Sequence, residues 1–171
     1  MDVLNKKIEV LENRLKAETE NSIKLEQYTR RENLRFNNIT EIEKEDCKIL
    51  RHRVIQNEMD IDTSDIKFHA VHRVGVKQEG RCRPIIARFI SRQDRDLIWQ
   101  NRGKIKNSDN YPDAYITEDF ARAIQLERKT SIKAMMKARE SAGLPDAKVV
   151  GRFLIINNER YDHNHIPEYL K

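Results

Sequence analysis

The segment Tyr28–Ile39, which reads YTRRENLRFNNI, marks a change in the periodicity of the apolar residues. Before it, apolar residues recur at the spacing of a helix, and after it they alternate as they do in strands. The segment also holds three arginines, Arg30, Arg31 and Arg35. It therefore predicts a junction where a helix passes directly into a strand, with positive charge gathered at the junction.

The helix before this junction carries a heptad pattern. Its apolar residues have the spacing of a and d positions in a coiled coil, and they are Leu4, Ile8, Leu11 and Leu15. Lys7 and Glu12 enclose two of these positions, which resembles the signature of parallel trimers with lysine in place of arginine. Two heptads are too short to be stable alone, so we expect a longer natural coil and a homotrimer. The alternative is an amphipathic helix that packs on its own domain.

Beyond the junction, the sequence predicts four strands. They are expected from Asn33 onward, over Ile66–Val74, over Pro84–Ile90 and over Ala114–Ile116. Two helices are expected between them. The first covers Glu41–Asp60 and has one apolar stripe, formed by Ile49, Leu50, Val54, Ile55 and Met59. The second follows Ser91, which can act as its N-cap, and runs to about Gly103.

The resulting β-α-β-β-α-β order is that of the ferredoxin-like arrangement. One common use of this arrangement is the RNA recognition motif, whose two central strands present aromatic residues to bases. The third strand here lacks the usual Gly-Phe-x-Phe pattern and places Ile86 and Arg88 on the open face. We therefore expect RNA binding through arginine, without reading of the base sequence.

A second α/β unit follows Thr117. A helix is expected over Asp119–Ala142, ended by Gly143 and Pro145. Its predicted buried face consists of Phe120, Ala123, Ile124, Ile132, Met135, Met136 and Ala138. Its predicted basic surface consists of Arg122, Arg128, Lys129, Lys133, Lys137 and Arg139. Asn157-Asn158 predicts a hairpin turn, with Val149, Phe153 and Ile155 alternating before it.

Charge is distributed unevenly along the chain, whose net charge is +5. Residues 1–63 carry net −2, residues 64–109 net +6, residues 110–119 net −3 and residues 120–171 net +4. Positive charge on both globular parts favours a polyanionic partner. We expect three segments, namely a coiled coil over 1–31, an RNA recognition motif domain over 32–116 and a C-terminal domain over 117–171.

Four sequence blocks resemble the first-open-reading-frame proteins of LINE-type retrotransposons. These blocks are Glu26–Arg35 at the junction, His72–Gly75 at the end of the second strand, Arg83–Phe89 in the third strand and Ile116–Phe120. They fall in the family's order across nearly the whole chain. The resemblance implies a trimeric coiled coil, an RNA recognition motif domain and a small C-terminal domain. The coil here is shorter than the family's usual coil.

The resemblance also implies a function. It implies binding of single-stranded RNA and DNA, nucleic acid chaperone activity and coating of the element's own transcript during retrotransposition. It implies that the protein is located in cytoplasmic ribonucleoprotein particles, with the nucleus as a second candidate location. By position, the family's RNA-contacting role falls to Arg35, Arg88, Arg128 and Lys129, although Lys129 departs from an arginine pair. Together with the other exposed-face candidates, the predicted RNA-binding residues are Arg30, Arg31, Arg35, Arg73, Arg88, Arg122, Arg128, Lys129, Arg152 and Tyr161.

The sequence gives little support for metal binding or catalysis. We expect no cofactor and no enzymatic activity. Cys47 and Cys82 lack metal-ligand spacing and are expected to be free thiols. The sequence DHNH at 162–165 contains a lone His-x-His, which in a terminal loop is more often solvated than metal-bound. No apolar run reaches the length of a membrane span. The alternative function is a coiled-coil protein–protein scaffold whose sheet binds a peptide.

Overall fold

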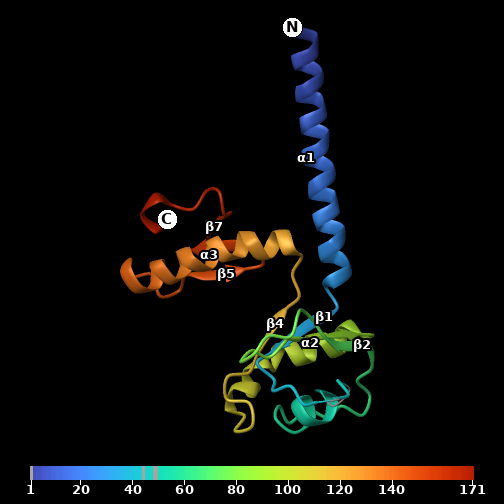
Figure 1. The fold of residues 1–171 in the computed structure, drawn as a ribbon. Coiled ribbons are helices and arrows are strands. Elements are labelled where there is room, and N and C mark those ends of the chain that lie inside the picture. The colour runs from blue at the N-terminus through green and yellow to red at the C-terminus, as the bar shows by residue number, and fades with distance from the viewer. Residues whose placement is uncertain (1, 44, 48–49) are drawn as a thin grey trace. The chain divides into compact units, whose positions relative to one another are not determined.

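The computed structural model describes residues 2–43, 45–47 and 50–171 (Figure 1). The chain divides into two compact units. One unit consists of Thr29–Asp119, and the other combines the residues up to Tyr28 with Phe120–Lys171. The predicted mixed α and β character, with a long N-terminal helix and antiparallel sheets, is confirmed.

Helix α1 spans Asp2–Arg30, without a glycine or proline to interrupt it. The apolar side chains at its predicted a and d positions lie in solvent within the single chain, with exposed fractions from 46% at Ile8 to 69% at Leu15. An unbroken helix was predicted here. Its apolar seam, formed by Leu4, Ile8, Leu11 and Leu15, has no covering element in the described chain.

The unit Thr29–Asp119 contains a four-stranded sheet. Its strands are β1 (Asn33–Asn37), β2 (Phe68–Arg73), β3 (Ile85–Phe89) and β4 (Tyr115–Glu118). The order is β2-β3-β1-β4, and every neighbouring pair is antiparallel. The four predicted strands are all present, with β1 and β3 in the centre.

One face of this sheet is covered by a hydrophobic core. Leu34 and Phe36 from β1 and Ala87 and Phe89 from β3 are fully buried there. Helix α2 (Arg92–Gln100) packs Ile98 into the same core and begins at Ser91, whose hydroxyl accepts from the amides of Gln93 and Asp94, as predicted. A 3₁₀ segment, Arg102–Asn107, follows it.

The helix predicted over Glu41–Asp60 is largely wrong. Among the described residues of this range, 41–43 and 45–47 are not helical, and Leu50–Gln56 forms a π-helix. The physical reason is that a side chain from β2 fixes the start of this segment, because Arg73 donates to the carbonyl oxygens of Ile39 and Thr40 and pairs with Glu45. Val54, Ile55 and Met59 are nevertheless buried as predicted. Ile49 and the side chain of Leu50, also predicted for this stripe, lie outside what the structure describes.

The C-terminal residues form a helix on a small sheet. Helix α3 spans Arg122–Ser141, and strands β5 (Lys148–Val150), β6 (Phe153–Ile156) and β7 (Glu159–Tyr161) form an antiparallel sheet in that order. A 3₁₀ turn, Glu168–Leu170, ends the chain. The predicted hairpin turn is confirmed, because Asn157 and Asn158 have φ of 50° and 67°, as a type I′ turn requires.

The core between α3 and this sheet differs in part from the prediction. Ile124 and Ala138 are buried as expected, but Met136 is half exposed, and the prediction that it is buried is wrong. Buried Ser131 occupies the helix face instead, where its hydroxyl donates to the carbonyl of Arg152 at 3.0 Å. A small side chain at this position lets the sheet approach the helix closely.

Candidate nucleic-acid interface

The face of the four-stranded sheet opposite its core is the first candidate surface. Side chains alternate along β1, so Arg35 lies opposite the buried neighbours Leu34 and Phe36. The same alternation along β3 places Ile86 and Arg88 on this open face. We call this surface the open face, and its members are Asn33, Arg35, Asn37, Ala70, His72, Ile86, Arg88, Tyr115 and Thr117.

Strand register sets the two arginines of the open face on neighbouring strands. Arg35 is paired with Ile86 on β3, and Arg88 is paired with Asn33 on β1. The two arginines are therefore diagonal neighbours at the centre of the sheet. Arg88 is exposed, whereas Arg35 is half-buried and its Nη1 lies 3.7 Å from Asp119 Oδ1. Of the two, Arg88 is the better placed to meet a phosphate.

Tyr115 adds an aromatic ring to the open face that the sequence analysis missed. It pairs with Asn37, and its side chain is 46% exposed. Ile116 points into the core, so Tyr115 and Thr117 face outward. The sequence analysis could not identify it, because its orientation depends on the register of β4, which begins one residue later than the predicted Ala114. An exposed aromatic beside arginines is a common feature of surfaces that stack nucleobases.

Asp119 holds the junction between α1 and β1 together. Its side chain is fully buried, and its Oδ2 accepts from Arg30 Nη1 at 3.0 Å and from Asn33 Nδ2 at 2.9 Å. Arg31 lies 3.5 Å from Glu32. The three junction arginines that were predicted to bind RNA, Arg30, Arg31 and Arg35, therefore lie beside carboxylates. These carboxylates reduce the net positive charge that the arginines offer to a ligand.

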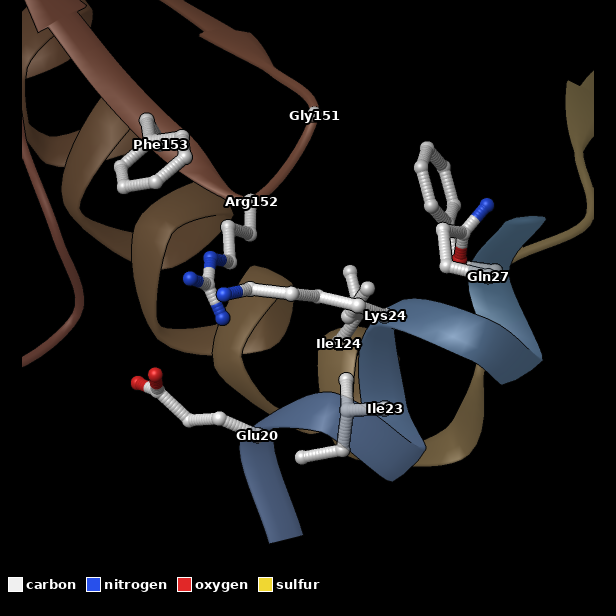
Figure 2. A pocket seen from close by; sticks show the side chains of 9 residues that line it. Glu20, Ile23, Lys24, Gln27, Ile124, Gly151, Arg152 and Phe153 are labelled. Atoms are coloured by element: carbon white, nitrogen blue, oxygen red, sulfur yellow. The ribbon is translucent and has the colours of Figure 1, made fainter. Parts of the chain in front are cut away.

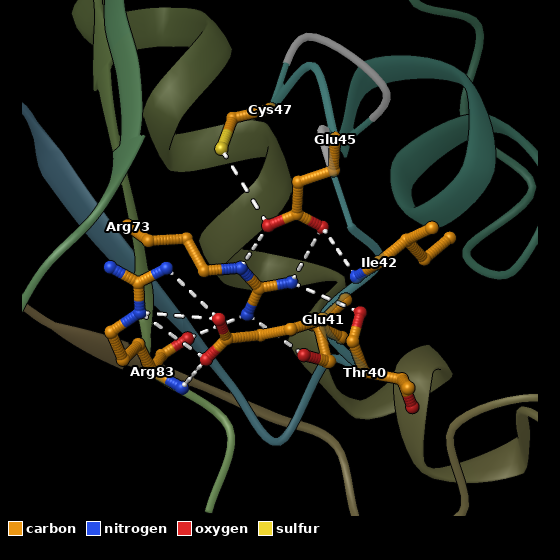
Figure 3. A network of polar contacts seen from close by, with 8 residues as sticks. Thr40, Glu41, Ile42, Glu45, Cys47, Arg73 and Arg83 are labelled. Atoms are coloured by element: carbon orange, nitrogen blue, oxygen red, sulfur yellow. Dashed lines mark hydrogen bonds and ion pairs between the residues drawn. The ribbon is translucent and has the colours of Figure 1, made fainter. Parts of the chain in front are cut away.

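Arg73 lies in an internal network rather than on a surface (Figure 3). Its side chain is 3% exposed and is paired with Glu45. Its guanidinium also donates to the carbonyl oxygens of Ile39 at 2.8 Å, Thr40 at 3.0 Å and Arg83 at 2.6 Å. Because these contacts occupy the guanidinium, we leave Arg73 out of the candidate interface, although the sequence analysis included it.

The same network contains a second ion pair. Arg83 Nη2 lies 2.9 Å from Glu41 Oε2, and the Arg83 amide also donates to this carboxylate (Figure 3). These hydrogen bonds favour the charged form and lower the pKa of Glu41 to about 2. The bonds from Arg73 lower the pKa of Glu45 in the same way. The network ties Ile39, Thr40, Glu41 and Glu45 to Arg73 at the end of β2 and to Arg83, which precedes β3.

The predicted basic residues of the C-terminal part lie in different settings. Arg122 and Lys129 on α3 are exposed. The Arg128 guanidinium lies 4.2 Å from the ring centroid of Phe120 and also donates to the carbonyl of Gly151. Arg152 Nη1 lies 3.3 Å from Glu127, and the hydroxyl of Tyr161 donates to Glu159, which raises the pKa of this tyrosine.

A cavity of about 330 Å³ lies in the unit that contains α1 and the C-terminal residues. Figure 2 shows the side chains of Lys24 and Arg152 extending into the same space beside Ile23. At one end, Gln27 Oε1 accepts from the amide of Ala121 at 2.9 Å. The sequence could not indicate this cavity, because its walls come from segments about a hundred residues apart. Its volume and its mostly apolar lining are those of small-ligand sites in general and do not indicate a particular ligand.

The described part of the chain offers little for metal or membrane chemistry. Over residues 2–43, 45–47 and 50–171, no group of three or more His, Cys, Asp or Glu is placed to hold a metal ion. His165 in the predicted His-x-His contacts Asp162 at 2.8 Å instead. Cys47 and Cys82 are free. Within the same residues, no helix combines the length and apolarity needed to cross a membrane.

Comparison with known proteins gives no assignment. No protein-family model matches the chain, and no curated protein is significantly similar to it. The function therefore has to be argued from the residues and their geometry.

Proposed function

We propose that this protein binds single-stranded RNA and DNA without reading their sequence, and that it acts as a nucleic acid chaperone. In this proposal it coats the transcript of a LINE-type retrotransposon as an oligomeric ribonucleoprotein. The observation that carries the proposal is the open face of the four-stranded sheet, where Arg35 on the central strand β1 lies between exposed Arg88 on β3 and exposed Tyr115 on β4. It combines a cation for phosphate with an aromatic ring for bases.

The strand order supports interpreting Thr29–Asp119 as an RNA recognition motif. The order β2-β3-β1-β4, with β1 and β3 in the centre and all pairs antiparallel, is the order that a ferredoxin-like sheet has. The connection between β1 and β2 departs from the pattern, because it holds a short π-helix in place of a regular helix. The central strands that would contact RNA are unaffected by this departure.

The chemistry of the open face explains why binding should tolerate any sequence. Every nucleotide carries a phosphate and a base with two π faces, so pairing with Arg88 and stacking on Tyr115 are available to all of them. Sequence reading needs hydrogen bonds to base edges from groups held in fixed positions. Asn37, the amide nearest to Tyr115, already donates to Thr117 Oγ1 at 3.2 Å.

A second contribution comes from the C-terminal residues. Arg122 and Lys129 project from α3 into solvent and carry positive charge that a phosphate chain would neutralise. Two separate basic surfaces on one chain raise the effective concentration of a bound strand near the second surface. This arrangement suits a protein that covers a long transcript.

The apolar seam of α1 supports the proposed homotrimer. Its four side chains are exposed in the single chain, and burying them between copies would stabilise the assembly through the hydrophobic effect. Changing Ile8 and Leu11 to serine should give a monomer that keeps its fold, as measured by light scattering and circular dichroism. If the unmodified chain is already a monomer at high concentration, this seam does not assemble the protein by itself.

Binding itself is tested by fluorescence anisotropy with a labelled single-stranded RNA of mixed sequence. Arg88→Ala should weaken binding to every sequence alike, because the lost contact is to phosphate. Arg92→Ala is the matched control, since Arg92 lies on α2 and pairs with Asp96 at 3.4 Å. Equal affinity of Arg88→Ala and the unmodified protein would contradict the assignment of the open face.

A further inference from the structure

The sheet of the C-terminal residues has one face that α3 does not cover. Leu154 and Ile156 point toward α3 and are buried, with Val149 and Tyr161 beside them. The alternation along the strands places the neighbouring residues on the opposite face. We call this the outer face, and its members are Lys148, Val150, Phe153, Ile155 and Arg160.

Phe153 lies at the centre of a cationic stack on the outer face. The guanidinium carbon of Arg160 is 3.5 Å from the centroid of its ring, and that of Arg152 is 5.2 Å away. The first distance is that of two planar groups in van der Waals contact. Arg160 is exposed, so the side of its guanidinium that faces away from Phe153 is open to a planar ligand.

Arginine–aromatic pairs are dense in this part of the chain. Three pairs, Arg128–Phe120, Arg152–Phe153 and Arg160–Phe153, fall within Phe120–Lys171. Energetically significant cation–π pairs occur roughly once per 70–80 residues in ordinary structures. Two guanidiniums also lie over Trp99, from Arg95 and Arg102, so the number of pairs alone does not indicate a ligand and the exposure and charge of the outer face must do so.

The charge of the outer face indicates which ligand. Among the described residues, no carboxylate lies within ion-pair distance of Arg160 or Lys148. Val150 beside them is 53% exposed. The carboxylates of an acidic peptide would pair with these positive charges but would not stack on the flat face of the Arg160 guanidinium. A single strand of nucleic acid offers phosphates and flat bases together, and so it complements both features.

We propose that the outer face is a base-stacking site for single-stranded nucleic acid. A nucleobase stacks on the Arg160 guanidinium, which rests on Phe153, while Lys148 meets an adjacent phosphate. This site is separate from the open face of the four-stranded sheet. The inference rests on the proposed function, since it names a second place on the chain where the same class of ligand binds.

The test compares two probes of equal length and charge: a strand of deoxythymidines, and the same phosphate chain built from abasic sugars. Arg160→Lys keeps the charge but removes the plane, so it should lose about five- to tenfold in affinity for the thymidine strand. Its affinity for the abasic strand should be unchanged. Phe153→Leu, which keeps an apolar side chain against the sheet, should show the same pattern. Arg92→Lys serves as the matched control, because Arg92 lies on α2.

Three other outcomes would contradict the inference, and the measurements distinguish them. Unchanged binding of the thymidine strand by Arg160→Lys, with binding still weakened in Arg88→Ala, removes the outer face and leaves the proposed function standing. Equal losses for both strands reduce Arg160 to a charge contact and remove the stacking. If the unmodified protein binds neither strand, the proposed function falls as well. Circular dichroism checks that each variant is folded, and Arg160→Lys decides the question should Phe153→Leu unfold.

Discussion

The setting of Arg73 and Arg95 in Thr29–Asp119 contrasts with that of Arg160 in Phe120–Lys171. In Thr29–Asp119, Arg73 and Arg95 are buried and paired with Glu45 and Glu118. In Phe120–Lys171, Arg160 lies on an aromatic ring and keeps its charge in solvent. Net charge is +6 for residues 64–109 and +4 for residues 120–171, yet in both segments several arginines are bonded within the protein, as Arg95 is to Glu118 and Arg152 to Glu127. Net charge is therefore a poor guide to how much charge a surface can offer to a ligand.

The largest effect expected from this contrast is on stability. Arg73→Ala leaves the Glu45 carboxylate and three backbone carbonyls without their donor, and breaking a buried pair from one side costs about 3–5 kcal/mol. Urea unfolding followed by circular dichroism should show a large fall in the midpoint. Arg92→Ala, on the exposed face of α2, should barely change it. A small effect of Arg73→Ala would mean that the network contributes little to the fold.

A second prediction concerns the stability of the protein at low pH. The pKa of Glu41 is lowered from 4.5 to about 2 by its bonds to Arg83, so the stabilisation that it supplies is fully present above pH 4.5. This stabilisation should be lost as the pH falls from 4.5 toward 2, because the carboxylate is then protonated. Glu41→Gln should flatten that part of the curve of unfolding free energy against pH. If both proteins lose stability in parallel over this range, Glu41 is not the responsible group.

A third prediction concerns the exposed bases of α3. Arg122→Ala combined with Lys129→Ala should leave the melting temperature unchanged, since both side chains are in solvent. The same variant should lower the slope of log affinity against log salt by about 1.4, at roughly 0.7 for each phosphate contact with a single strand. An unchanged slope would show that these bases only keep the helix soluble.

These contrasts also show what the sequence could and could not predict. Helix α1, the four strands and the turn at Asn157-Asn158 follow from local patterns, namely heptad spacing, alternation and a turn-forming dipeptide. The helix expected over Glu41–Asp60 is largely wrong because Arg73 and Arg83, distant in sequence, bond to Thr40 and Glu41 at its start. Tertiary contacts of that kind leave no periodic signal.

The same distinction between local patterns and tertiary contacts applies to the site residues. Alternation correctly placed Arg88 opposite the buried Ala87 and Phe89. The same reasoning could not show that Arg73 is enclosed, or that Tyr115 faces outward, because both depend on strand register and on partners from elsewhere. Arg160 escaped notice for a related reason. Its stacking on Phe153 requires two strands to be aligned across the hairpin at Asn157-Asn158.

The most direct test of the central claim is the salt dependence of binding to single-stranded RNA. The unmodified protein should show a log affinity that falls linearly and steeply with log salt, because phosphate contacts release counterions. Arg88→Ala should bind every sequence more weakly, with a slope lower by about 0.7. An affinity that does not respond to salt, or that Arg88→Ala leaves unchanged, would contradict the account and favour a protein-binding scaffold.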